Sequence, residues 1–79
     1  MNDAPEVSRP PHYTQGEIEH LDALRTILTA DEWRGFLRGQ VFKYLWRMAD
    51  KGKPLEDSRK AHFYLCRLIH HLKEVQGEE

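Results

Sequence analysis

The chain has 79 residues and a mass of 9.4 kDa, which suits one small domain, because a fold of this size buries only about 60% of the surface that its unfolded chain exposes. Hydrophobic residues make up 39% and charged residues 32% of the sequence, which excludes collagen-like and wholly disordered chains, and a mean hydropathy of -0.76 without a long apolar run excludes a membrane span. The net charge of -1 is unevenly distributed: residues 1–32 carry seven acidic residues against two basic ones, and residues 33–53 carry six basic residues against one acidic one. We therefore expect the basic middle third to pack against the acidic first third or to face an anion.

The N-terminal segment is predicted to be an extended arm over residues 1–11. Three of the four prolines fall there, and proline disfavours helix at the residue before it. The first six residues have neither a basic nor an apolar stretch, so we expect no signal peptide. Cys66 is the single cysteine, which fits a reducing compartment and a cytoplasmic protein.

A helical domain is predicted over residues 12–75, followed by a frayed end at residues 76–79. Its first helix lies between Gly16 and Thr29, where the spacing of apolar residues predicts one buried stripe made of Ile18, Leu21, Leu24, Ile27 and Leu28. Thr29 and Glu32 have the spacing of a capping box, which predicts that a second helix begins there and runs to about Asp50.

The third helix is predicted to begin after a strong stop signal, Lys51-Gly52-Lys53-Pro54. We expect it to bury a stripe made of Ala61, Tyr64, Leu65, Leu68, Ile69 and Leu72. No strand pattern and no internal repeat occurs in the sequence. The prediction is therefore an all-α domain of three helices joined by short turns.

The second helix is apolar on two opposite sides. One side, suited to the core, holds Trp33, Leu37, Val41, Tyr44 and Met48. The other side holds Gly35, Gly39, Phe42 and Trp46, and we expect Phe63 of the third helix to face outward in the same way. Because two other helices can cover only one of these sides, the second predicts a homo-oligomer interface. Coverage by the N-terminal arm and contact with a ligand or a host protein are the alternatives.

The residues that can carry chemistry form no familiar catalytic motif. The sequence lacks both the phosphate-binding Gly-x-x-x-x-Gly-Lys-Ser/Thr loop and the Gly-x-Ser-x-Gly nucleophile motif. Glu19 and Asp22 lie three residues apart on one helix face, where two carboxylates can share a magnesium ion or a proton. The alternative is that both pair with Lys43 and Arg47. If the four are not mutually satisfied, the cations can take a nucleotide phosphate and the acids its metal.

Two further groups of residues carry side chains that bind ligands or metals in other proteins. His12 and Tyr13 precede the first helix, where they either belong to a site or cap the core, with Tyr13 as a hydrophobic staple. His62, Cys66 and His70 are four residues apart. Since this spacing drifts around the helix, the three cannot converge on one tetrahedral ion, and no zinc site is expected.

Taken together, these residues resemble a small phage-encoded, nucleotide kinase-like family of unknown function. The resemblance extends over residues 10–72, with Gln40 and Ser58 as departures from the usual pattern. It is carried by His12-Tyr13, Ile18-Glu19, Asp22, Gly35-Phe36, Gly39, Lys43-Tyr44-Leu45-Trp46-Arg47, Lys51-Gly52, Glu56-Asp57, Lys60-Ala61 and Tyr64-Leu65. One larger relative, from a lytic podovirus, is a deoxynucleoside monophosphate kinase without a Walker loop. The resemblance implies that a similar activity is possible here.

Two hypotheses follow. In the first, a phage protein of nucleotide metabolism holds phosphates on Lys43, Arg47 and Lys60. His12 or Tyr13 then lies against the base, and Glu19, Asp22 or Asp57 holds magnesium. In the second, a non-enzymatic phage protein inhibits or titrates a component of host defence or signalling through its aromatic helix face. Nucleic-acid binding is not expected, because the pI is about 6.5 and no recognition motif is present.

Overall fold

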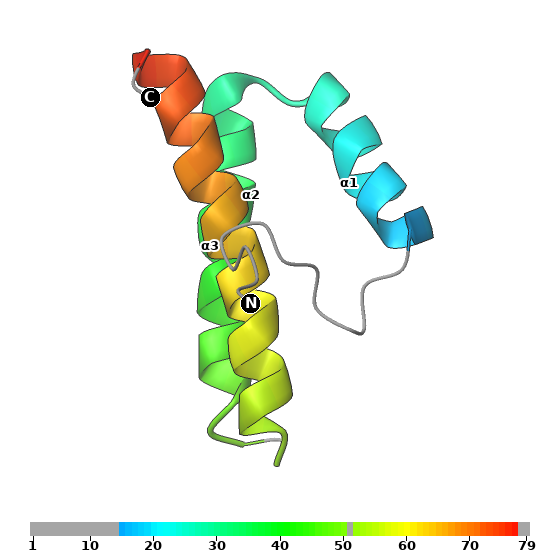
Figure 1. Cartoon of the computed structure of the whole chain (residues 1–79), viewed down its shortest axis with the longest axis vertical. Helices are drawn as coiled ribbons and strands as arrows, with labels where there is room; N and C mark the ends of the chain where they lie inside the picture. The colour runs from blue at the N-terminus through cyan, green and yellow to red at the C-terminus, as the bar shows by residue number, and fades with distance from the viewer. Residues whose placement is uncertain (1–14, 51, 78–79) are drawn as a thin grey trace, which may run out of the picture.

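The computed structural model describes residues 15–50 and 52–77, and within these ranges the chain is all-α. Three helices follow one another: α1 (Gln15–Ile27), α2 (Ala30–Arg47) and α3 (Pro54–Gln76). Figure 1 shows α2 and α3 side by side as an antiparallel hairpin, with α1 inclined away from them. The predicted arm over residues 1–11 and the candidate residues His12 and Tyr13 lie outside the described residues. None of the described helices is long and apolar enough to cross a membrane.

The starts of α2 and α3 follow the predicted signals, and their ends differ from the prediction. The hydroxyl of Thr29 accepts a hydrogen bond from the backbone N–H of Glu32 at 3.1 Å, and the Glu32 carboxylate accepts one from the Thr29 N–H at 2.9 Å, which completes the capping box. Helix α2 ends at Arg47, three residues before the predicted Asp50, and the chain passes through a turn in which Gly52 has a φ of 74°. Pro54 opens α3, and Gly77 closes it in the left-handed conformation.

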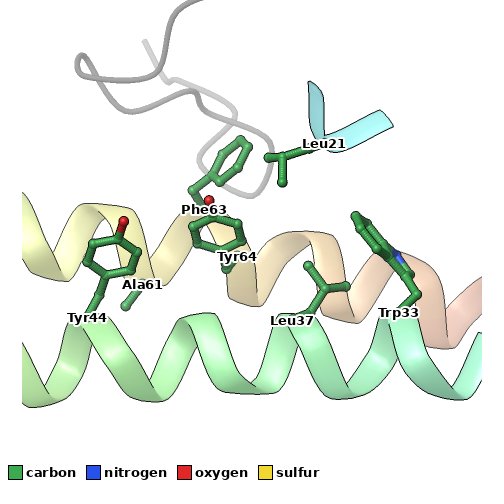
Figure 2. Close-up of a cluster of buried hydrophobic side chains, with 7 residues drawn as sticks. All are labelled: Leu21, Trp33, Leu37, Tyr44, Ala61, Phe63 and Tyr64. Carbon is green, nitrogen blue, oxygen red and sulfur yellow. The ribbon is translucent and has the colours of Figure 1, made fainter. Parts of the chain in front are cut away.

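The core is an aromatic ladder between α2 and α3. Tyr64 occupies its centre: its ring stacks on Tyr44 with centroids 5.9 Å apart, and it meets Phe36 and Phe63 edge-on at 6.3 and 5.1 Å. Trp33 is 2% exposed and Leu37 is 0% exposed. Figure 2 shows Trp33, Leu37, Tyr44 and Tyr64 between the two helices, with Leu21 reaching in from α1. The predicted core side of α2 is therefore confirmed. Burial of each large apolar side chain stabilises the fold by about 1.5–3 kcal/mol.

The predicted buried stripe of α3 is partly wrong. Leu65 and Ile69 are 41% and 47% exposed, whereas Phe63 is only 6% exposed, although the sequence placed it on the outer side. The buried arc of α3 is turned towards Phe63, because this helix packs on α2 along one line and meets Leu21 of α1 beside it. Phe63 is therefore a core residue and does not belong to the predicted oligomer interface.

Helix α1 contributes fewer buried groups than its pattern suggested. Leu21 is buried, and Ile18, Leu24 and Leu28 pack partly against the core. Ile27 is 76% exposed, contrary to prediction. It follows Leu21 by six residues, which places it about 120° around the helix from that side chain. Two ion pairs fasten α1 to α3: Arg67 to Asp22 at 2.9 Å and Arg25 to Glu74 at 2.6 Å.

Candidate functional site

A group of three cations surrounds the ring of Tyr44 near the C-terminal end of α2. The Lys43 ammonium lies 5.0 Å from the ring centroid, the Lys60 ammonium 5.5 Å and the Arg47 guanidinium carbon 5.6 Å. Lys43 and Arg47 are one helical turn apart on α2, and Lys60 reaches the same ring from α3. We call these four residues the cationic cluster. Three like charges around one ring repel one another, so an anion placed among them is favoured.

Two carboxylates offset part of this charge. Glu56 pairs with Lys60 at 3.1 Å, and the side chain of Lys60 is only 16% exposed. Asp57 faces Arg47, with 3.9 Å between the carboxylate Oδ1 and the guanidinium Nε. Lys43 is exposed and, among the described residues, has no ion-pair partner. The outward charge of the cluster is therefore carried by Lys43 and by the open part of Arg47, whose side chain is 40% exposed.

Asp57 is buried in an unusual way. The residue is 1% exposed, and neither of its carboxylate oxygens has a hydrogen-bond partner in the structure. The Nε of Arg47 is likewise buried without a hydrogen bond. Buried charges are normally paired and hydrogen-bonded. This pair is held by charge at a distance beyond a hydrogen bond.

The structure brings together part of the predicted site. Lys43, Arg47, Lys60 and Asp57 lie close together on the hairpin. Glu19 is exposed on α1, and Asp22 is bound to Arg67 of α3. The expected pairing of Glu19 and Asp22 with Lys43 and Arg47 is wrong, because α1 is fastened to the stretch of α3 that holds Arg67 and Glu74.

The predicted magnesium ligands do not form one donor set. Within residues 15–50 and 52–77, no group of three or more His, Cys, Asp and Glu side chains is placed to hold a metal ion. The oxygens of Asp57 are closed to solvent, whereas magnesium keeps several water ligands. On α3, the Cys66 thiol lies 3.4 Å from the ring of His62, and His70 instead pairs with Glu74 at 3.3 Å.

Sequence reasoning misses the part that Tyr44 plays in the cluster and that Glu56 plays beside it. The sequence places Tyr44 in the core alone, yet all three cations also lie against its ring. Its position between Lys43 and Arg47, next to a neighbouring helix, was the available signal. Glu56 was not assigned a role, although its spacing of four residues from Lys60 is that of a helical ion pair.

The second apolar side of α2 is exposed as predicted. Phe42 and Trp46 are 65% and 66% exposed, and their rings lie 5.9 Å apart. Gly35 and Gly39 continue this side towards the helix N-terminus, and a Cβ atom built on either would meet nothing within 4 Å. We call Gly35, Gly39, Phe42 and Trp46 the aromatic face. Along this side of the helix, the two glycines are followed by the exposed aromatic pair.

A pocket of about 290 Å³ lies at the opposite end of the hairpin. Trp33, Leu28 and Val75 give it an apolar lining, and the lining also includes His71, whose Nδ1 is buried without a hydrogen-bond partner. Arg25 and Glu74 also line it, and the hydrogen bond and charge of Arg25 lower the pKa of the Glu74 carboxyl. The pocket shares no lining residue with the cationic cluster.

The fold and this cluster define a small all-α domain that carries a basic site on an aromatic platform. The chain belongs to the DUF3310 family, described as proteins of unknown function, whose family model matches residues 7–66. The matched range includes every residue of the cationic cluster and ends before His71. No curated protein and no solved structure matches the chain.

Proposed function

We propose that this chain is a phage protein that binds a nucleotide by its phosphate groups at the cationic cluster. The observation that carries the proposal is the convergence of Lys43, Arg47 and Lys60 on the ring of Tyr44. Phosphate oxygens accept charge-assisted hydrogen bonds from ammonium and guanidinium groups, which are stronger than neutral ones. An anion here also relieves the repulsion among the three cations.

On this proposal the three cations have different roles. Lys43 is exposed and meets the ring of Tyr44, so it is placed to take the ligand directly. Arg47 offers its open part, since its Nε is turned to the interior. Lys60 is recessed and held by Glu56, so it contributes mainly to the local potential. A magnesium ion would enter with the nucleotide, held by its phosphate oxygens, because the acidic side chains described above do not form a site for it.

The test is a thermal-shift and calorimetric screen of the full chain. The probes are inorganic phosphate and the mono-, di- and triphosphates of the common nucleosides, with and without magnesium. A ligand present at 100 times its Kd stabilises a protein by about 2.7 kcal/mol. K43M should lose the shift, whereas K73M, which removes an exposed lysine from the last turn of α3, should keep it. No shift with any nucleotide would overturn the proposal.

The same samples report phosphoryl transfer. A kinase-like activity without a Walker loop would convert a monophosphate into a diphosphate when a triphosphate is present. Product formation that K43M abolishes and K73M retains would extend the proposal from binding to catalysis. Absence of product with retained binding would restrict the function to nucleotide binding.

The aromatic face supports a second proposal, that two copies of the chain associate through α2. On each copy the exposed pair Phe42 and Trp46 follows Gly35 and Gly39 along the same side. An antiparallel second copy therefore places each aromatic pair over the other copy's glycines, and a two-fold axis repeats the contact. Sedimentation should show self-association at micromolar concentration. A compact monomer would overturn the proposal, and a host protein, the alternative occupant of this face, would then be sought by its binding to purified chain.

A further inference from the structure

We propose that Asp57 is a positioning residue that holds the Nε of Arg47 against the core and leaves the rest of the guanidinium open to the phosphate. This inference rests on the proposed function. Asp57 does not touch the ligand. It acts through the ion pair between its Oδ1 and the Nε of Arg47, 3.9 Å apart.

The first observation is the division of the Arg47 side chain into a buried and an open part. Its Nε is buried, while the side chain as a whole is 40% exposed. The exposed surface therefore belongs to the remaining atoms, and the guanidinium carbon lies 5.6 Å from the ring of Tyr44. Two neighbours, a carboxylate and an aromatic ring, thus restrict the guanidinium.

The second observation is that, apart from the favourable dipole at the first turn of α3, Arg47 is the partner that the described residues offer this carboxylate. Both oxygens of Asp57 lack a hydrogen-bond partner, and the residue is 1% exposed. A carboxylate kept in such a place is costly unless a nearby cation compensates it. At a binding site, a carboxylate behind the contacting group fixes that group's orientation, as the outer partners of metal ligands do.

The position of Asp57 in the chain makes this arrangement rigid. It belongs to the first turn of α3, and its backbone N–H donates to the Lys53 carbonyl at 2.9 Å. Arg47 is the last residue of α2. The pair therefore joins the two helix ends on either side of the turn, and the orientation of Arg47 depends on the packing of the hairpin.

Charge alone and a positioning role predict opposite effects of removing the Asp57 carboxylate on phosphate binding. Asp57 places a negative charge beside an anion site, so D57N should strengthen phosphate binding if only the local potential matters. A positioning role predicts weaker binding, because Arg47 loses the contact that orients it. Loss of an outer orienting partner weakens metal sites by 10- to 100-fold, and we expect the Kd here to rise by about tenfold. E56Q is the comparison for charge: it removes the negative charge beside the recessed Lys60, and charge alone predicts that it tightens binding.

The experiment measures the Kd of inorganic phosphate and of AMP by calorimetry for the wild type, D57N, R47M, R47M/D57N and E56Q. All samples are held at a temperature where circular dichroism shows the native helix content. D57N should weaken binding in the wild-type background and change the Kd by less than about twofold in the R47M background, since a residue that acts only through Arg47 has no effect once Arg47 is absent. The Arg47 Nε–H resonance, followed by ¹H–¹⁵N NMR, should shift and broaden in D57N and stay in place in E56Q. If Asp57 had a purely structural role, D57N would change the Kd by the same factor in both backgrounds, and the coupling energy between Asp57 and Arg47 would be zero.

The possible failures are distinct. If neither probe binds the wild type, the proposed function fails at this site, whatever the variants show. If the wild type binds and D57N binds as tightly or more tightly, the positioning role is refuted while the phosphate site stands. If D57N weakens binding equally in both backgrounds, Asp57 does not act through Arg47, and the inference is also refuted.

Discussion

Replacing Arg47 by methionine tests whether the cationic cluster is also part of the structure. Without the guanidinium, Asp57 remains 1% exposed and loses the ion-pair partner that the described residues give it, so that only the N-terminal dipole of α3 offsets its charge. Breaking a buried ion pair in this way costs about 3–5 kcal/mol. Water reaches part of the Arg47 side chain, which is 40% exposed, and the separation of 3.9 Å is long. We therefore expect R47M to lose about 2–3 kcal/mol of unfolding free energy, below the fully buried range.

Lys43 supplies the comparison within the same cluster. Its ammonium lies over the ring of Tyr44 at 5.0 Å, and an exposed cation–π contact contributes about 0.5–1 kcal/mol. K43M should therefore be close to the wild type in stability while losing nucleotide binding. In a domain of this size, 1 kcal/mol shifts the Tm by about 4–8 °C. R47M should then melt roughly 10–20 °C below the wild type, and K43M within a few degrees of it.

The assay is urea and thermal denaturation followed by circular dichroism, with m-values checked for constancy. The double variant R47M/D57N removes both charges and should recover part of the stability lost in R47M, because the stranded carboxylate is gone. Equal, small losses for K43M and R47M would refute the reasoning, since they would show that Asp57 does not depend on Arg47. Failure of D57N to rescue R47M would contradict it in the same way.

The other predictions concern the helix contacts. G39L should abolish self-association seen by sedimentation while keeping the helix content, because a side chain at Gly39 meets nothing within 4 Å in the single chain and leucine is a good helix former. F63A should instead destabilise the chain itself by about 3–5 kcal/mol in urea, the usual cost of emptying a buried phenylalanine site; loss of assembly at unchanged stability would contradict this. The lowered pKa of Glu74 means that its pair with Arg25 stabilises the docked α1 above the ordinary glutamate pKa and loses this effect as the pH falls through the lowered value. Fluorescence of Trp33 followed from neutral to acid pH should report that loss in the wild type and less of it in E74Q.

The starts of α2 and α3 were predictable because local chemistry determines them, whereas the end of α2 at Arg47 and the left-handed Gly77 after α3 were not predicted. Thr29 and Glu32 satisfy each other's backbone at the start of α2, and Pro54 suits the first position of α3. Each signal acts within a few residues. No knowledge of the rest of the chain was needed to place them.

The rotation of α3 was not predictable in the same way. Its apolar residues cover a wide arc, so either edge of that arc was available for burial. The docking of α1 selects the edge that holds Phe63 and leaves Leu65 and Ile69 exposed. The ion pairs from Asp22 and Arg25 to α3 depend on that docking. A helical pattern gives the width of an apolar stripe, but a neighbouring helix decides which part of it is buried.

Part of the candidate site, namely Lys43, Arg47, Lys60 and Asp57, was predictable from the sequence as residues and not as a geometry. The spacing of Lys43 and Arg47 places both on one side of α2, whereas the arrival of Lys60 and Asp57 beside them depends on how α3 is paired with α2 after the turn. That register also makes Tyr44 the ring that all three cations share. The arrangement joins helix contacts and charge, and neither is visible in one helix alone.

The places where this chain departs from ordinary packing are the places to which the proposals assign function. Sequences that fold reliably satisfy buried polar groups, separate like charges and cover large apolar side chains, and departures gather at functional sites. Here a buried carboxylate lacks hydrogen bonds, three cations surround one ring, and two aromatic side chains stand exposed on α2. A bound anion would reduce the repulsion among the three cations, and through Arg47 it would act on the buried carboxylate of Asp57. A second copy of the chain would cover the two exposed aromatic side chains. Because the aromatic face and the cationic cluster share α2, nucleotide binding and association can be measured separately on one helix, with K43M affecting the former and G39L the latter.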